Sequence, residues 1–341
     1  MEILINCMSN TETQKTFFTD RVMEELRACG NVREGVFTRD GLRDALPGVD
    51  VLFGSWGLPR LDEDLLSKAD KLKMVCYTGG SVADQMTETV ADRGIHMLSG
   101  NRLYANSVAE GTIGYILLAQ RRLIKVINET AENGWAPFYH SDGIRFKTVG
   151  IIGFGMIAKY LVKMLQAFEC RVLICSDWFR PEDETEYRAE KCDMETLFRE
   201  SDIVTLHESL RDDTYHMIDR RYFGLMKPDS LFVNTARGPI IVEEDLAEAA
   251  KAGRIRAVLD VYEKEPLPMD SCLRGCENII LIPHRGGPTI DIREHVTLAL
   301  IRDLRACIRD GENAVLENEI SWEYARHMTH SAANIKKQDK R

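Results

Sequence analysis

Three side chains that can bind anions and move protons follow one another in the second half of the chain: Arg237, Glu265 and His284. Arg237 comes directly after an apolar run, where a guanidinium group can hold a carboxylate through two hydrogen bonds. A carboxylate beside an imidazole favours the imidazolium form and fixes the tautomer, so Glu265 and His284 are expected to form an acid–base pair. Such a pair can protonate a carbonyl oxygen as hydride arrives from a nicotinamide, or remove a hydroxyl proton in reverse. The spacing therefore predicts a hydride-transfer site in which Arg237 also polarises the substrate carbonyl.

A glycine turn, Gly153-Phe154-Gly155-Met156-Ile157-Ala158, precedes these residues. It lies between an apolar run at 148–152, typical of a buried parallel strand, and a helical apolar pattern at 157–168. Gly153 permits the tight turn, and Gly155 lets backbone N–H groups approach a pyrophosphate. Met156 and Ile157 begin the helix, whose positive end faces the phosphates. The turn therefore predicts a dinucleotide-binding site.

The cofactor is predicted from the end of the next strand, 171–176, which Asp177 follows. An acid at this position receives the ribose hydroxyls of the adenosine half. It would repel a 2′-phosphate, so NAD is favoured over NADP. Arg180 could pair with such a phosphate if the loop folded back.

The composition indicates a globular protein of two domains that acts on small molecules. The chain has 341 residues, more than one hydrophobic core usually holds. Its net charge of −10 argues against a nucleic-acid or membrane surface, so local cations must capture anionic substrates. The start lacks the features of a signal peptide, and nine cysteines without a CxxC pair indicate a reducing cytoplasm. Cys272 and Cys276 have no second ligand pair nearby, so no metal site is expected.

Strands and helices alternate along both halves, which predicts an α/β fold of two Rossmann-like parallel-sheet domains, one flavodoxin-like and one NAD-binding, with a cleft between them. We expect a discontinuous substrate-binding domain at 1–104 and 289–325, an NAD-binding domain at 105–288 and a polar tail at 326–341. A long apolar helix at 107–127, with Asn106 as its N-cap, would connect the domains. The predicted strands are 2–6, 50–53, 72–77, 95–98, 148–152, 171–176, 203–206, 231–234, 257–260 and 279–281. Further helices are predicted at 13–29, 62–69, 82–92 and 291–309.

Taken together, these motifs resemble those of the D-isomer-specific 2-hydroxyacid dehydrogenases, a family that includes lactate, glycerate and phosphoglycerate dehydrogenases. The similar segments are 153–158, 201–207, 227–238, 260–266 and 283–284. The resemblance implies that Arg237, Glu265 and His284 are the catalytic residues. It also implies that Asp260 binds the nicotinamide carboxamide.

The same resemblance implies further contacts and an assembly. Cofactor contacts are expected at His207, Thr235 and Ala236. Family members generally dimerise through the NAD-binding domain, and the region of Trp135 resembles part of the dimer arm. We therefore expect a homodimer.

The chain departs from the family pattern in its presumed substrate loop. The family usually has a glycine-rich loop that ends in Asp. This chain has Tyr77-Thr78-Gly79-Gly80-Ser81-Val82-Ala83-Asp84, so the expected Asp is absent or displaced. The N–H groups of Gly79, Gly80 and Ser81 could still hold a carboxylate. Trp56, after a predicted strand, either covers the substrate side chain or belongs to the core.

Two further departures lie in the predicted NAD-binding domain. The residue after the catalytic His is commonly apolar in the family but is Arg285 here, which either recognises an additional acidic group or points to solvent. The frequent Pro after His207 is replaced by Glu208-Ser209, a change expected to reshape the adenine-side loop.

We therefore expect an NAD-dependent, cytoplasmic oxidoreductase that interconverts a small 2-oxo acid and an (R)-2-hydroxy acid, with hydroxypyruvate or glyoxylate reductase-like activity favoured. His284 would be the acid–base group, paired with Glu265, and Arg237 would bind the substrate carboxylate or carbonyl. The alternative is a corepressor-like protein that senses NAD(H) with little turnover. Loops outside these motifs determine which 2-hydroxy acid is used.

Overall fold

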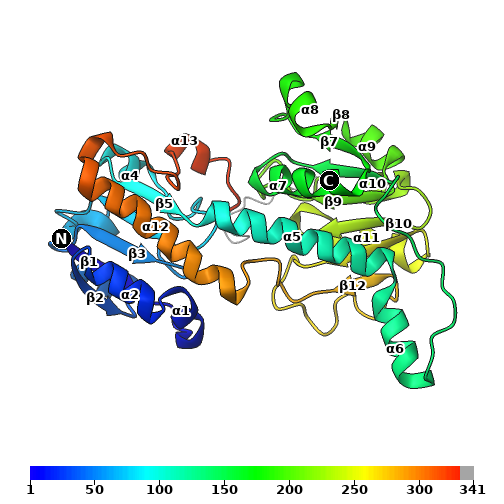
Figure 1. The fold of residues 1–341 in the computed structure, drawn as a ribbon, viewed down its shortest axis with the longest axis horizontal. Coiled ribbons are helices and arrows are strands. Elements are labelled where there is room, and N and C mark those ends of the chain that lie inside the picture. Colours follow the sequence, from blue (N-terminus) through cyan, green and yellow to red (C-terminus); the bar gives the residue numbers. More distant parts are fainter. Residues whose placement is uncertain (331–341) are drawn as a thin grey trace. The chain divides into compact units, whose positions relative to one another are not determined.

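The structure is a computed structural model that describes residues 1–330. The chain forms two compact units (Figure 1). Unit 1 comprises 1–105 together with the segment from 288 to the end of the described residues, and unit 2 comprises 106–287. Most of the predicted polar tail, 331–341, lies outside the described residues.

A five-stranded parallel sheet, in the order β2-β1-β3-β4-β5, is the centre of unit 1. Its strands are β1 (Glu2–Asn6), β2 (Asn31–Gly35), β3 (Val51–Gly54), β4 (Met74–Tyr77) and β5 (His96–Ser99). Four of them are apolar runs that the sheet buries on both faces, which is why the sequence predicted them. β2 was not predicted, because it is an edge strand and its residues are polar and largely exposed.

Several short helices and one long helix, α12, accompany this sheet, and several predicted bounds were wrong. The helical segments are α1 (Thr11–Phe17), α2 (Asp20–Arg27), α3 (Arg39–Ala45), η1 (Leu65–Lys68), α4 (Glu88–Asp92), α12 (Ile290–Asp310), η4 (Gly311–Asn313) and α13 (Trp322–Ala325). The predicted helix at 13–29 is two helices, because Thr19 is extended and caps α2 by accepting the N–H of Val22 at 3.3 Å. Thr87 likewise starts α4 by capping Val90, so the predicted helix at 82–92 is shorter.

Residues 326–330 belong to unit 1, although the sequence analysis assigned them to the tail. Met328 is 7% exposed within the core of this unit. The carbonyl of Thr329 accepts a hydrogen bond from Ser81 Oγ at 2.6 Å, and His330 Nδ1 lies 3.2 Å from Asp84 Oδ1. These contacts fix the segment on the loop after β4.

A seven-stranded parallel sheet, in the order β12-β11-β10-β9-β6-β7-β8, is the centre of unit 2. Its strands are β6 (Thr148–Ile152), β7 (Arg171–Cys175), β8 (Glu190–Lys191), β9 (Ile203–Leu206), β10 (Ser230–Asn234), β11 (Ile255–Leu259) and β12 (Ile279–Leu281). The helical segments of this unit that follow β6 are α7 (Met156–Leu165), η2 (Gln166–Phe168), α8 (Pro181–Tyr187), α9 (Met194–Glu200), α10 (Arg220–Leu225), η3 (Gly238–Ile240) and α11 (Glu243–Lys251). Only β8, a two-residue polar edge strand, was not predicted.

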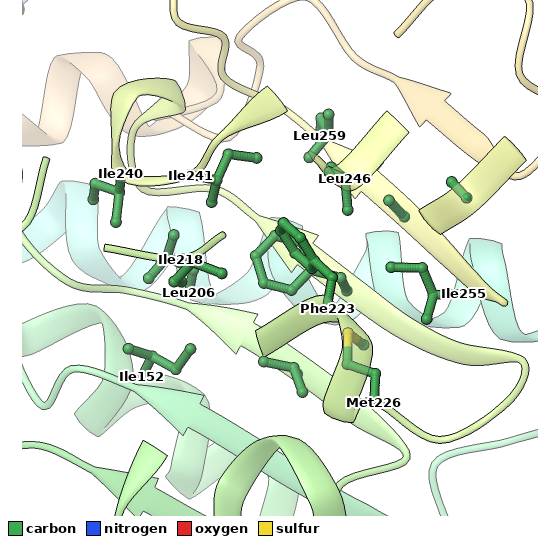
Figure 2. Close-up of a cluster of buried hydrophobic side chains, with 14 of the residues drawn as sticks. Ile152, Leu206, Ile218, Phe223, Met226, Ile240, Ile241, Leu246, Ile255 and Leu259 are labelled. Carbon is green, nitrogen blue, oxygen red and sulfur yellow. The ribbon is translucent and has the colours of Figure 1, made fainter. Parts of the chain in front are cut away.

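The core on one face of this sheet is aliphatic and aromatic, and Figure 2 shows part of it. Phe223 of α10 packs edge to face on Phe232 of β10, with ring centroids 5.3 Å apart. Ile255 and Leu259 of β11 join the same cluster. This packing fixes the ends of β9, β10 and β11, which carry the loops described below.

The connecting helix was predicted at 107–127 and is instead two helices, α5 (Asn101–Gln120) and α6 (Leu123–Asn133). Asn106 lies inside α5 and is not its N-cap. Arg122 interrupts the helix with a φ of +51°, a left-handed conformation. No helix among residues 1–330 is long and apolar enough to cross a membrane.

Candidate active site

The glycine turn lies where the chain order reverses across the sheet of unit 2, since β6 pairs with β7 on one side and β9 on the other. Ligands of open parallel sheets bind at such a point, outside the carboxyl ends of the strands. Gly153 has a φ of +90°, and its N–H donates to the carbonyl of Cys175 at 2.9 Å. A Cβ at Gly153 would lie 2.8 Å from the carbonyl oxygen of His207 and 2.9 Å from Glu208 Cα. The turn therefore requires glycine here.

The start of α7 fits a pyrophosphate. Gly155 is the N-cap of the helix and has no side chain to occupy the first N–H groups. A Cβ built on Gly155 would meet no atom within 4 Å, so the space before Met156 and Ile157 is open. The positive end of the helix favours anions there. These residues would hold the diphosphate of a dinucleotide.

The acid predicted to bind the ribose follows β7. Asp177 is exposed, and the glycine turn contacts the strand end two residues before it, through Cys175. Arg180, which could have bound a 2′-phosphate, instead has its guanidinium 3.9 Å from the carboxylate of Glu182. Its backbone N–H donates to Asp183 at the start of α8. The positive charge of Arg180 is thus partly offset by the carboxylate of Glu182.

Three other predicted cofactor residues are partnered inside the protein. His207 is buried, its Nε2 lies 2.9 Å from Thr205 Oγ1, and burial lowers its pKa to about 3. Its Nδ1 is buried without a partner among the described residues. Thr235 Oγ1 lies 3.3 Å from Thr112 Oγ1, and the N–H of Ala236 donates to Asn234 Oδ1. Their backbone, following β9 and β10, faces the same edge of the sheet as the glycine turn.

The acid–base pair is in place. His284 Nδ1 lies 2.7 Å from Glu265 Oε2, and both side chains are partly exposed, at 47% and 36%. Glu265 Oε1 accepts the N–H of Tyr262 at 3.0 Å. Burial raises the pKa of Glu265, but the hydrogen bonds from His284 and Tyr262 and the charge of Arg237 outweigh it, so the pKa is lowered overall. Glu265 is therefore an ionised partner for the imidazole at neutral pH.

Arg237 follows β10, and its loop packs directly against the loop that carries Glu265. A Cβ on Gly238 would lie 1.9 Å from the carbonyl carbon of Tyr262 and 2.2 Å from the nitrogen of Glu263. Only glycine permits this approach. Arg237 Nη1 donates to the carbonyl of Ala236 at 2.6 Å. The fold thus places a guanidinium, a carboxylate and an imidazole at three neighbouring strand ends.

Asp260 holds the loop that follows His284. Its two carboxylate oxygens accept the N–H groups of Arg285, at 2.6 Å, and Gly286, at 2.7 Å. Tyr115 of α5 donates its hydroxyl to the same carboxylate at 3.3 Å. Burial raises the pKa of Asp260 despite the two backbone N–H groups. Sequence motifs gave no signal for Tyr115, which is an ordinary aromatic residue of an apolar helix.

A second carboxylate–imidazole pair, also missed, lies two residues from the first. Glu263 accepts a hydrogen bond from the Tyr215 hydroxyl at 3.1 Å and lies 3.3 Å from His216 Nε2. The rings of Tyr215 and His216 stack at 4.0 Å. Glu243 accepts the N–H of Glu263 at 2.7 Å. Only the proximity of Glu263 to Glu265 in the sequence could have drawn attention to it.

The predicted substrate residues of unit 1 lie after β3 and β4. Trp56 is 47% exposed and makes edge-to-face contacts with Phe17 and Tyr104, so it is not a core residue. The carbonyls of Gly79 and Gly80 accept hydrogen bonds from Ser99 Oγ. In unit 2, Arg285 is exposed, and its guanidinium forms no ion pair with any residue from 1 to 330. No group of three His, Cys, Asp or Glu residues in that range could hold a metal ion.

Comparison with known proteins gives the family. The model of the NAD-binding domain of D-isomer specific 2-hydroxyacid dehydrogenases matches residues 113–286. A glyoxylate reductase of Thermococcus litoralis is 32% identical over 256 residues, which cover 72% of this chain and 77% of the relative. A putative 2-hydroxyacid dehydrogenase of Staphylococcus epidermidis is 30% identical over 275 residues, covering 79% and 86%.

A phosphoglycerate oxidoreductase of Rhizobium etli has a similar solved structure, with a TM-score of 0.80 at 22% identity. The match covers 95% of this chain and 98% of that one, and it concerns the fold alone. The domain model and the two sequence relatives show the family as well as the fold. The chain therefore belongs to the D-isomer specific 2-hydroxyacid dehydrogenases and is an oxidoreductase that acts on CH–OH groups with a nicotinamide cofactor.

Proposed function

We propose that this enzyme interconverts a small 2-oxo acid and its (R)-2-hydroxy acid with NAD(H), with hydroxypyruvate or glyoxylate as the favoured oxo acid. The observation that carries the proposal is the 2.7 Å contact between His284 Nδ1 and Glu265 Oε2, beside the loop of Arg237. A guanidinium, a carboxylate and an imidazole suit a substrate with an anionic group next to a carbonyl.

The proposed roles follow from the contacts. The bound nicotinamide supplies the hydride. Because Glu265 engages Nδ1, Nε2 of His284 is the nitrogen that gives a proton to the carbonyl oxygen, or takes one from the hydroxyl in the other direction. The ionised Glu265 contacts Nδ1 and so fixes the orientation of the imidazole ring. Arg237 holds the substrate carboxylate and polarises the carbonyl.

Further substrate contacts are proposed for Trp56, for Gly79, Gly80 and Ser81, and for Arg285. The N–H groups of the glycine loop suit a carboxylate. The guanidinium of Arg285, next to His284 in the chain, forms no ion pair with any residue from 1 to 330 and suits a second acidic group on the substrate. For the cofactor, the exposed carboxylate of Asp177 and the pairing of Arg180 with Glu182 favour NAD over NADP.

A homodimer formed through unit 2 is proposed from its exposed apolar side chains. None of the residues of α6 is buried. The exposed group consists of Leu123, Ile124, Ile127, Trp135, Phe138 and Phe146. A single chain rarely leaves such a group in water, so a second copy is the expected cover. Light scattering should give twice the mass of one chain, and a Phe138→Glu variant should lower the measured mass toward that of a single chain.

The nine cysteines are free thiols, which supports the proposed cytoplasmic location.

Turnover with 2-oxo acids tests the proposal. NADH absorbance would be followed with hydroxypyruvate, glyoxylate, pyruvate, phenylpyruvate and oxaloacetate, with NADPH as the cofactor control. We expect turnover of at least one small 2-oxo acid, and a preference for oxaloacetate would implicate Arg285. Tight NADH binding without any turnover would contradict the proposal and favour a sensor of NAD(H).

A further inference from the structure

Two carboxylates lie on opposite sides of the glycine turn, and the sequence predicted a cofactor contact for only one of them. Asp177 follows β7, and the turn reaches this strand through the Gly153 N–H to Cys175 O contact. Glu208 follows β9, and a Cβ added to Gly153 would lie 2.9 Å from the Cα of Glu208. Because β6 lies between β7 and β9 in the sheet, the two acids approach the turn from its two flanks.

Glu208 is held in a fixed position. Its Oε1 accepts hydrogen bonds from Arg211 Nη1 and from the N–H of Ser209, both at 2.9 Å, and its side chain is 18% exposed. Arg211 is shared with Asp213, at 3.1 Å, so one guanidinium faces two carboxylates. Acids therefore outnumber the base on this flank.

Two cations in the neighbouring segments each contact another group. Lys191 Nζ donates to the carbonyl of Phe179 at 2.8 Å, and Arg180 faces Glu182. The thiol of Cys175, at the end of β7, has its pKa raised to about 11, first by burial and then by Asp177, Asp193 and Glu208, and the charge of Lys191 partly opposes this rise. The fields of Asp177 and Glu208 thus overlap at the end of β7.

We propose that Glu208 is a second specificity-determining residue, which acts with Asp177 to reject a dinucleotide that carries a 2′-phosphate. The inference rests on the proposed function, because it assumes that a dinucleotide occupies the turn. A 2′-phosphate adds about two negative charges at neutral pH, which two carboxylates repel more than one. The diphosphate is tolerated because the start of α7 offsets its charge. Arg211 is a positioning residue that holds Glu208 and reduces its field.

The test is direct binding, without substrate, of NADH and NADPH to the full chain by fluorescence titration. The proteins are the wild type, Asp177→Ser, Glu208→Gln and the double variant, with Glu195→Gln as control, an exposed ion-paired acid on α9. We expect Glu208→Gln to lower the ratio of the NADPH to the NADH dissociation constant by about threefold to tenfold in either background. The control should leave the ratio unchanged.

A variant that should change the ratio of dissociation constants in the opposite direction distinguishes a charge effect from misfolding. Arg211→Met in the Asp177→Ser background keeps the Glu208 charge but removes its counter-charge, so the ratio should rise. An unchanged ratio in Glu208→Gln, or a fall in Arg211→Met, would overturn the inference. Because the ratio is read without an oxo acid, it decides this point even if no 2-oxo acid is reduced. Absence of binding of either dinucleotide would overturn both the inference and the proposed function.

Discussion

Two carboxylate–imidazole pairs arise from one short loop, yet their surroundings differ. In the first, Glu265 and His284 are 2.7 Å apart and both side chains are substantially exposed. In the second, Glu263 and His216 are 3.3 Å apart, at 31% and 29% exposure, with Tyr215 stacked on the imidazole and bonded to the acid. We propose proton transfer for the first pair and loop attachment for the second, because their surroundings differ in this way.

The second pair joins the loop that carries Glu265 to the segment that follows Arg237. The N–H of His216 donates to the carbonyl of Pro239, in the loop after Arg237, at 2.9 Å. The N–H of Glu263 is bound by Glu243, the first residue of α11. The first pair is the more exposed of the two, and it is the pair to which we assign the proton transfer.

Removal of the reactive imidazole should have the largest effect. His284→Ala is expected to lower kcat for 2-oxo acid reduction by about 10³-fold, because it removes the proposed proton donor. The NADH dissociation constant should change little. His216→Ala is the matched variant of the second pair, and an equal loss of kcat in both would remove the distinction between the pairs.

The contact between the two loops can be broken at Gly238. Gly238→Ala would place a Cβ within 1.9 Å of the Tyr262 carbonyl carbon, so the loops of Arg237 and Glu265 must separate. A displacement of this size is expected to cost about 10²-fold in kcat/KM. Gly224→Ala is the control, since a Cβ there meets no atom within 4 Å. Full activity of Gly238→Ala would show that the close approach is not needed.

The two acids can be compared by the same replacement. Glu265→Gln is expected to lower kcat by about 10²-fold and to alter the pH profile, because the imidazolium loses its counter-charge. Glu263→Gln should lower kcat by about tenfold through displaced loops, with an unchanged pH profile. Steady-state kinetics between pH 5 and 9 would measure both. A shifted profile in Glu263→Gln would assign that pair to the chemistry.

A third histidine sharpens the comparison, since His207 has a hydroxyl rather than a carboxylate as partner. Burial holds its pKa at about 3, below its ordinary value of 6.5, so between these values the unfolded chain binds a proton that the folded chain does not. Its contribution to stability is complete above pH 6.5 and falls by about 1.4 kcal/mol per pH unit below it. Urea unfolding of His207→Gln should show less loss between pH 6.5 and 5 than the wild type. The exposed His140→Gln variant should match the wild type.

Parts of this arrangement could be predicted from the sequence because they are local. The apolar runs at 148–152 and 203–206 became β6 and β9, and Gly153 lies at the left-handed turn that its position between strand and helix indicates. The polar edge strand β2 and the break at Arg122 carry no apolar periodicity, so they were missed.

Apart from that of Glu265 with His284, the contacts between distant loops could not be predicted. Asp260 is bonded to Arg285 and Gly286, which lie 25 and 26 residues further along the chain. Glu263 is bonded to His216, 47 residues before it. These contacts depend on how the strand ends pack, which no single segment encodes. The distinction between the two pairs therefore required the structure.

Transfer of label is the most direct test of the account. The enzyme would reduce glyoxylate, hydroxypyruvate and pyruvate with NADH that carries deuterium at both C4 positions, and the products would be analysed by NMR and chiral chromatography. We predict deuterium at C2 of an (R)-2-hydroxy acid from hydroxypyruvate or pyruvate, or at C2 of glycolate, and its loss in His284→Ala with NADH binding intact. Product without deuterium at C2, or transfer at the wild-type rate in His284→Ala, would contradict hydride transfer assisted by His284.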